Sequence, residues 1–175
     1  LTKSGTAIES ADYTLDGTIA ISALSTSASI TLSAVLDALD EDTETVIIDI
    51  DAVTNGTENA TQTQTVAILD NDVTPTVTMG AVDGSMGENT GTTTLSVPFT
   101  LSAGAGRDVT VMLAKTGTAI EDTDYTLPGK AGINPIIIPA GIQTVSVSLV
   151  ALGDILDETN ETVIIDIDTV TNGTE

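Results

Sequence analysis

Apolar and polar residues alternate in short runs along most of this chain. In the run ASITLSAV at 28–35, one face holds Ala28, Ile30, Leu32 and Ala34. A period of two residues is typical of a β-strand with one buried face, whereas an amphipathic helix repeats every ~3.6 residues. Long runs with the helical period are absent, so we predict an all-β fold.

The same pattern predicts further strands at 45–51, 63–69, 76–79, 92–101, 108–115, 144–151 and 162–168. The run TVIIDID occurs twice, and its alternation separates a Val/Ile face from a face with two aspartates, which we expect to point to solvent. Pro98 lies inside the run 92–101 and indicates an edge strand or a bulge, because proline has no backbone N–H to donate.

Two segments of the sequence occur twice in the same order. KSGTAIESADYTL at 3–15 matches KTGTAIEDTDYTL at 115–127, and DEDTETVIIDIDAVTNGTE at 40–58 matches DETNETVIIDIDTVTNGTE at 157–175. The spacing gives a repeat of about 112–117 residues, the size of one β-sandwich domain. We therefore expect parts of two tandem sandwiches.

An Asn-Gly pair lies near the end of the second repeated segment in both copies. Asn-Gly between alternating runs is a strong hairpin signal, so the strand 45–51 is predicted to turn at Asn55 and to return as 63–69. No returning strand follows Asn172. We expect that strand to come from sequence beyond Glu175 or from another chain.

These patterns divide the chain into two incomplete copies of one domain. Residues 1–72 are predicted to be the C-terminal part of one repeat, and residues 73–175 the next repeat without its last strand. The boundary lies in DNDVTPTV at 70–77, where Pro75 stiffens a short connection.

The composition restricts both the core and the partners. Aromatic residues are few, so Val, Ile, Leu and Ala must fill the core together with Tyr13 and Tyr125.

Four basic and 26 acidic residues give a formal net charge of −22, which leaves no basic surface for nucleic acid or for an anionic membrane. No apolar run is long enough to span a bilayer, so we expect no membrane insertion in this segment. Without His or Cys, and without a serine beside an obvious base, we expect no enzyme.

The acidic residues gather at the ends of the predicted strands. A sandwich brings the loops of one end together, and converging carboxylates repel one another unless a cation lies between them. Calcium takes about six to eight oxygen ligands in loose geometry and fits such a cluster. Magnesium is an alternative with a smaller shell, and zinc is disfavoured without His or Cys. The competing interpretation is the solvated acidic surface of a salt-adapted protein.

Several segments together resemble the Calx-β domain, which is found in sodium/calcium exchangers and in many large bacterial surface proteins. They are GENTGTTTLSVPFTLS (87–102), the two GTAIE…DYTL segments, IIIPAG (136–141), DILDETNETVIIDI (154–167) and AILDND (67–72). The resemblance implies an immunoglobulin-like sandwich of about seven strands that binds calcium at one end.

The resemblance also implies a set of metal ligands: an early Glu, the Asp of the Asp-Tyr pair, a D…E-x-x-E segment and a terminal acidic triplet. In the second copy the implied ligands are Glu88, Asp124, Asp154, Glu158 and Glu161. In the first copy they are Asp12, Asp37, Glu41, Glu44, Asp70 and Asp72. The first copy lacks the early Glu and the second lacks the triplet, so neither has a full set.

These expectations favour a calcium-binding structural repeat of an extracellular or cell-surface fibre, stalk or adhesin, rigidified by Ca2+ at strand ends and junctions. Its partners would be neighbouring repeats of the same array. Two alternatives stay open: a calcium-sensor domain of a membrane transporter, and a filament subunit in which identical chains exchange strands. The sequons at Asn55, Asn59, Asn160 and Asn172 are glycan acceptors in a secreted eukaryotic protein, although a Thr-rich chain also produces them by chance.

Overall fold

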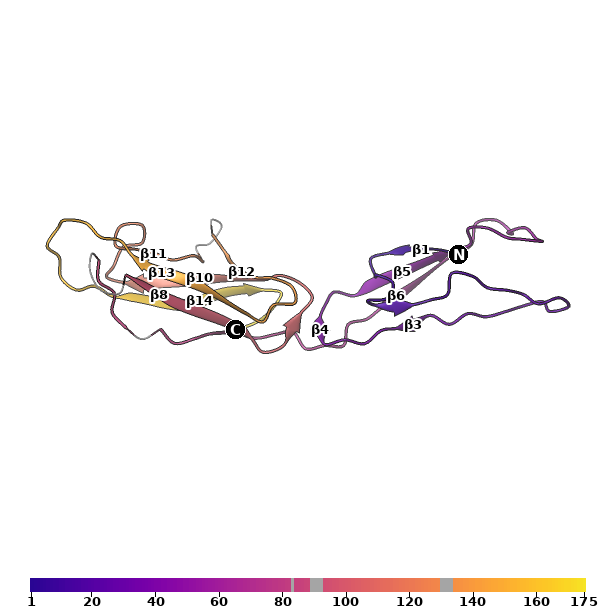
Figure 1. Cartoon of the computed structure of the whole chain (residues 1–175), viewed down its shortest axis with the longest axis horizontal. Coiled ribbons are helices and arrows are strands. Elements are labelled where there is room, and N and C mark those ends of the chain that lie inside the picture. Colours follow the sequence, from indigo (N-terminus) through magenta and orange to yellow (C-terminus); the bar gives the residue numbers. More distant parts are fainter. Residues whose placement is uncertain (83, 89–92, 130–133) are drawn as a thin grey trace. The chain divides into compact units, whose positions relative to one another are not determined.

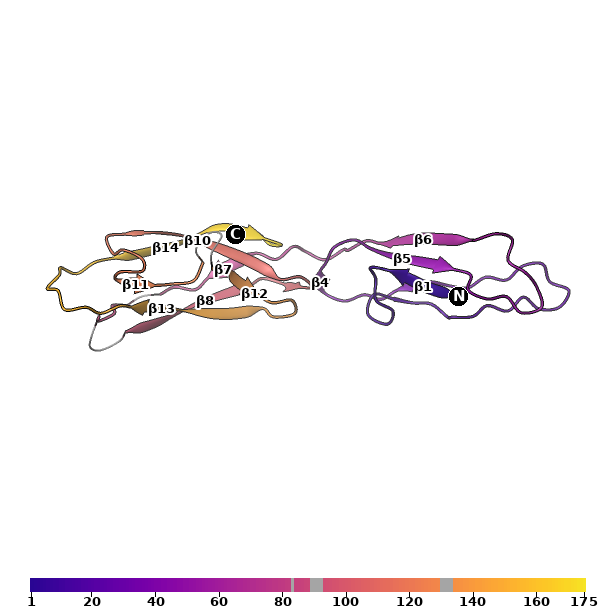
Figure 2. The same ribbon diagram turned by 90° about the horizontal axis from the view of Figure 1, so that it is seen from above.

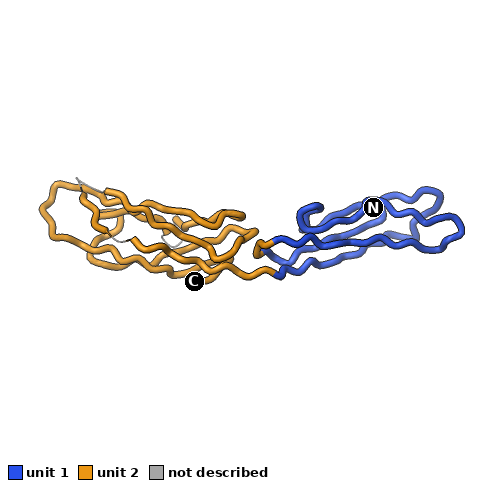
Figure 3. Tube along the Cα trace, turned by 60° about the horizontal axis from the view of Figure 1, so that its bottom comes forward, with its two compact units in different colours: residues 1–37, 41–71 blue, residues 38–40, 72–175 orange. Residues whose placement is uncertain are grey.

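The computed structural model of this chain describes residues 1–82, 84–88, 93–129 and 134–175. These residues form strands and no helix, which confirms the predicted all-β fold. A helix long and apolar enough to cross a membrane is therefore also lacking in the described ranges. The chain divides into two compact units (Figure 3): unit 1 contains residues 1–37 and 41–71, and unit 2 contains residues 38–40 and 72–175.

In chain order, the strands of the described residues are β1 (Thr2–Gly5), β2 (Tyr13–Thr14), β3 (Ser33–Ala34), β4 (Leu39–Asp40), β5 (Glu44–Asp49), β6 (Thr63–Ile68), β7 (Val77–Met79), β8 (Thr94–Leu101), β9 (Gly104–Ala105), β10 (Val109–Gly117), β11 (Tyr125–Thr126), β12 (Ile136–Ile138), β13 (Thr144–Ala151) and β14 (Val163–Thr171). Apart from the run 28–35, every predicted strand coincides with one of these within a few residues. Thr92, the predicted start of the run 92–101, lies outside the described residues.

Unit 2 has two main sheets that share one hydrophobic core (Figures 1 and 2). One sheet has the order β12-β10-β14 and the other the order β11-β13-β8-β7. Fully buried side chains come from both sheets, among them Phe99 of β8, Val111 of β10 and Ile138 of β12. A core enclosed by the inner faces of two sheets is the arrangement of a β-sandwich.

Unit 1 has fewer strands and a smaller core. Its sheet has the order β1-β5-β6, and the short strands β2 and β3 form a separate pair. The buried residues are Tyr13, Leu15 and Val46. Tyr125 occupies the core of unit 2 as Tyr13 does that of unit 1, so both predicted core tyrosines are confirmed.

The repeated sequences make the same strand pairings in both units. Gly5 of β1 lies opposite Val46 of β5, and Gly117 of β10 lies opposite Val163 of β14. Similarly, Tyr13 pairs with Ala34 in unit 1, and Tyr125 pairs with Ala151 in unit 2.

The predicted strand at 28–35 is wrong for most of its length, since only Ser33–Ala34 is a strand. In unit 2, the corresponding strand β13 pairs with β8 from Thr144 to Val150. Unit 1 contains no counterpart of β8, so the backbone of this run has no neighbour with which to form a ladder. The predicted apolar face persists in part, because Ile30 and Leu32 still pack against the unit 1 core.

The prediction of an edge strand or a bulge at Pro98 holds in part: β8 pairs with β13 without a bulge, but its pairing with β7 covers only Phe99–Leu101, so Pro98 lies at the end of that ladder. Its carbonyl accepts a hydrogen bond from the N–H of Gly80 at 2.8 Å. Since proline has no N–H to donate in return, the ladder of β7 ends at Met79, opposite Phe99. A side chain at position 80 would clash, since a Cβ there would lie 2.6 Å from the Pro98 ring.

The predicted return of β5 as β6 is confirmed, but the tight hairpin is wrong. The two strands pair antiparallel up to Asp49 and Thr63, so residues 50–62 form a longer loop. Asn55 adopts the left-handed φ of 62° that an Asn-Gly turn favours. Residues 57–62 carry no large apolar side chain that would hold them against the sheet, so the ladder does not extend to this turn.

Gly117, the last residue of β10, provides a test of strand packing. It has a φ of +123°, and a Cβ at this position would lie 2.0 Å from the carbonyl oxygen of Thr162. We expect Gly117→Ala to lower the free energy of unfolding by more than about 3 kcal/mol, because backbone must move. The matched control is Gly141→Ala, where φ is +74° but nothing lies within 4 Å, so only the backbone conformation costs about 1–2 kcal/mol. Urea unfolding measures the free energy of unfolding of both variants. Equal losses in the two variants would contradict the close approach of Gly117 to the Thr162 carbonyl.

Candidate metal-binding site

The same turn carries the first acidic residue of the site in both units. In unit 1, the N–H groups of Ala11 and Asp12 donate to the carbonyl of Ile8, and the Ile8 N–H donates to the Asp12 carboxylate. In unit 2, the Ile120 N–H donates to Oδ2 of Asp124 at 2.6 Å. The tyrosine that follows each aspartate is buried and anchors the turn. One carboxylate oxygen therefore holds the aspartate in place.

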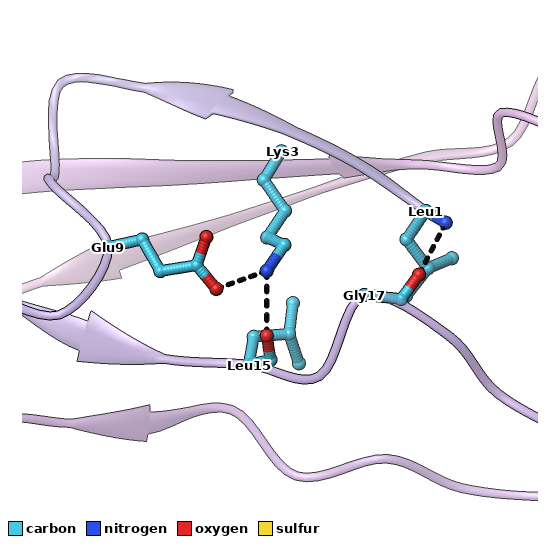
Figure 4. Close-up of polar contacts among 5 residues, drawn as sticks. All are labelled: Leu1, Lys3, Glu9, Leu15 and Gly17. Carbon is cyan, nitrogen blue, oxygen red and sulfur yellow. Dashed lines mark hydrogen bonds and ion pairs between the residues drawn. The ribbon is translucent and has the colours of Figure 1, made fainter.

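A lysine–glutamate pair braces this turn in both units, and the sequence patterns did not single it out. Lys3 forms an ion pair with Glu9 and donates to the carbonyl oxygen of Leu15 at 2.7 Å (Figure 4). Lys115 does the same with Glu121 and with the Leu127 carbonyl, and its side chain is only 7% exposed. The signal was present in the repeated segments, where a glutamate follows the lysine by six positions. The pair neutralises one acid next to the turn, and this lysine does not pair with the aspartate.

Three carboxylates come together in unit 1. The side chains of Asp12, Glu41 and Glu44 are each half-buried, and each offers an oxygen within 4.8 Å of the other two. Burial, a hydrogen bond with Asp12, and repulsion by Asp12 and Glu41 raise the pKa of Glu44 from 4.5 to about 7. Between pH 4.5 and about pH 7, the folded unit therefore keeps a proton on Glu44, whereas an isolated glutamate would be ionised.

Five carboxylates interact in unit 2, and they are the five predicted ligands of the second copy. Glu88, Asp154 and Glu158 offer oxygens within 4.8 Å of one another. Desolvation and repulsion by Asp154, Asp124 and Glu88 raise the pKa of Glu158. Desolvation, a hydrogen bond with Asp124 and repulsion by its neighbours raise the pKa of Glu161. Because Asp12 and Glu44 correspond to Asp124 and Glu161 in the repeat, the same hydrogen-bonded pair of carboxyl groups occurs in both units.

Three other predicted ligands, Asp37, Asp70 and Asp72, are not among the residues that form the three-carboxylate group of unit 1. Asp37 and Asp70 are exposed and lie outside the three-carboxylate group of unit 1, and Asp72 belongs to unit 2. Asp154, which corresponds to Asp37, directly follows the region of the long strand β13. The equivalent run before Asp37 has only the two-residue strand β3.

Asp40 is an acidic residue with a different function. It is 3% exposed, forms an ion pair with Arg107 and accepts a hydrogen bond from the Thr74 hydroxyl at 3.0 Å. Its carbonyl oxygen also accepts the N–H of Gly106, beside the short parallel pairing of β4 with β9. This aspartate is therefore a structural residue of unit 2.

The geometry of both groups suits a hard divalent cation. Oxygens bound to one calcium ion at about 2.3–2.6 Å lie no more than about 5 Å apart. The three carboxylates of each group have oxygens within 4.8 Å of one another. The chain has no His or Cys, so the donor set consists of oxygens, which calcium and magnesium prefer. A cavity of about 740 Å³ adjoins the unit 2 group, with Glu88, Asp124, Glu158 and Glu161 in its wall. Ligands from several segments and an open approach are compatible with a calcium site.

Comparisons of the chain with protein-family models, with curated proteins and with solved structures found no match.

The raised pKa of Glu44 predicts how stability depends on pH without a metal. The folded state binds a proton that the unfolded state releases between pH 4.5 and about pH 7, so stability falls as the pH rises through this window. We expect the free energy of unfolding in EDTA to decrease from pH 5 to pH 8. In Glu44→Gln this component disappears, because glutamine does not titrate. A wild-type stability that rises over the same window, or a decrease that persists unchanged in the variant, would contradict the assignment.

Proposed function

We propose that this chain is part of an array of immunoglobulin-like sandwiches of the Calx-β type, which bind calcium at their strand ends and serve as a structural element of an extracellular or cell-surface fibre, stalk or adhesin. The observation that carries the proposal is the shared carboxyl pair, Asp12 with Glu44 and Asp124 with Glu161, surrounded in each unit by further acids. A cation at this position would bind several segments of one unit together.

The arrangement of the acids argues for a binding site over a solvated coat. Acids of a coat reduce their repulsion by spreading over the surface, and they keep ordinary pKa values. Here the turn hydrogen bond holds Asp12 and Asp124 in place while glutamates from another segment approach them. Desolvation, and then repulsion by the neighbouring acids, raises the pKa of Glu44, Glu158 and Glu161, and a bound divalent cation would offset both effects.

A structural role is supported by the repetition itself. The turn, the lysine–glutamate brace and the carboxyl pair recur at equivalent sequence positions of both units. Segments that lie far apart in sequence, such as Glu88 and Glu158, contribute to one group. Calcium bound there would close long loops and reduce local opening of the strand ends, as a stiff repeat requires.

Calcium should stabilise the chain by mass action. At a free concentration 100 times the dissociation constant, one site adds about 2.7 kcal/mol to the free energy of unfolding. We expect thermal unfolding at pH 7.5 to shift to higher temperature in calcium, and much less in sodium chloride of the same ionic strength. Glu158→Gln and Glu44→Gln should each reduce the shift.

The matched control is Asp168→Asn, which removes one negative charge from an exposed position of β14 outside the carboxylate groups. This variant should keep the full calcium shift. If sodium chloride stabilises the chain as much as calcium does, or if all three variants lose the shift equally, the acids act only as a charged coat.

A further inference from the structure

The lysine–glutamate pair beside each acidic turn buries charge outside the carboxylate groups. In unit 2, the side chain of Lys115 is 7% exposed and that of Glu121 is 20% exposed. Lys115 pairs with Glu121 and also donates to the carbonyl oxygen of Leu127 at 2.7 Å. Removing two charges from water costs free energy even when they are paired, so a buried pair is weak evidence for stability alone. Its recurrence in both units points to a further role.

The pair fastens the two sides of the turn that contains the site aspartate. Lys115 belongs to β10, Glu121 lies within the turn, and Leu127 follows β11. One ammonium group on β10 therefore joins the beginning of the turn to the segment after it. The lysine of unit 1, which belongs to β1, makes the same contacts with its glutamate and with the residue after β2 (Figure 4).

The turn between these contacts holds an unfavourable backbone conformation. Asp122 has a φ of 69°, and Ser10, its equivalent in unit 1, has a φ of 76°. Such positive values are unfavourable for residues other than glycine and persist only where surrounding contacts enforce them. The N–H of Asp122 donates to the Tyr125 carbonyl at 2.9 Å, and that of Ser10 donates to the Tyr13 carbonyl at 2.8 Å. The turn thus depends on the contacts that surround it, and the lysine–glutamate pair is one of them.

The aspartate of the turn is placed by backbone groups next to this pair. The Ile120 N–H donates to Oδ2 of Asp124 at 2.6 Å, and the Asp124 N–H donates to the Ile120 carbonyl at 2.8 Å. The Asp124 carbonyl accepts the N–H of Leu152 at 2.8 Å, just before the segment of Asp154. Glu121 follows Ile120 directly in the sequence. A shift of Glu121 would therefore move the donor that holds the Asp124 carboxylate.

We propose that Lys115 and Lys3 are positioning residues for the two carboxylate groups, acting through the glutamate and the turn and not on the ion. The inference rests on the calcium-binding function proposed above. Its expected sign is opposite to that of charge alone. A positive charge in the same unit repels a cation, so loss of the lysine charge by itself would strengthen calcium binding. Loss of a group that orients a metal ligand weakens metal binding, typically by about 10–100-fold.

The test uses a double variant of the full chain that keeps its net charge. Lys115→Met removes one positive charge and Glu121→Gln removes one negative charge, so the overall electrostatic attraction of the unit for calcium stays nearly constant. The chain is labelled with 15N and titrated with calcium. The amide signal of Asp124 reports binding in unit 2, and that of Asp12 reports binding in unit 1. We expect the dissociation constant at Asp124 to rise by at least about tenfold, while that at Asp12 stays the same.

A second measurement needs no metal. In EDTA, amide exchange at Ile120 should become at least about tenfold faster in the double variant, because the brace no longer holds the turn. Exchange in the paired strands β8 and β10 should not change, which shows that the sandwich remains folded. The matched variant, Lys3→Met with Glu9→Gln, removes the more exposed pair of unit 1 and should weaken calcium binding at Asp12 alone. This variant decides by the same criteria if the first one unfolds.

Faster exchange of the turn amide together with weaker calcium binding in the altered unit alone supports the proposal. Unchanged or tighter binding, equal weakening in both units, or an unchanged exchange rate at Ile120 overturns it. Unfolding of both variants would give the pairs a purely structural role and would also overturn it. A wild-type chain that shows no calcium-dependent shift would overturn the proposed function and this inference together, whereas binding retained by the variants overturns the inference alone.

Discussion

Both units hold carboxylates close together at their strand ends, where these groups are partly desolvated and repel one another. The turn that leads to each buried tyrosine fixes Asp12 and Asp124 by a backbone N–H, so these acids cannot swing away from their neighbours. The lysine beside each turn is already paired with Glu9 or Glu121 and does not neutralise the aspartate. Burial, the hydrogen bond with Asp12, and repulsion by Asp12 and Glu41 raise the pKa of Glu44, and under our proposal a divalent cation stabilises the ionised group instead.

Strand pairing determines which parts of the repeated sequence become regular structure. A strand requires a neighbour for its backbone groups, and the two units lack different neighbours. Without a counterpart of β8, the unit 1 equivalent of β13 is reduced to Ser33–Ala34. Without a counterpart of β6, β14 still forms on β10, because one partner suffices, but its outer edge and Ile164 are left exposed.

Much of the fold followed from the period of two residues, because burial of one face produces that pattern directly. Val163, Ile165 and Ile167 point inward as the pattern predicts, while Ile164 and Asp166 are exposed. The failure at 28–35 has a physical cause: alternation describes a strand's faces and carries no information about its neighbours. The candidate metal-binding site was likewise predictable from the sequence only in part. Acids from separate segments converge in both units, and their distance along the sequence alone does not show this. The brace by Lys3 and Lys115 depends on three-dimensional proximity to carbonyl oxygens, which sequence spacing alone does not reveal.

The most direct measurement is a high-resolution crystal structure of the chain grown with millimolar calcium. We predict an ion among Asp12, Glu41 and Glu44, and a second among Glu88, Asp154 and Glu158, with carboxylate oxygens at about 2.3–2.6 Å. Strand ends whose carboxylates are splayed into solvent, with no ion between them at that calcium concentration, would contradict the central claim.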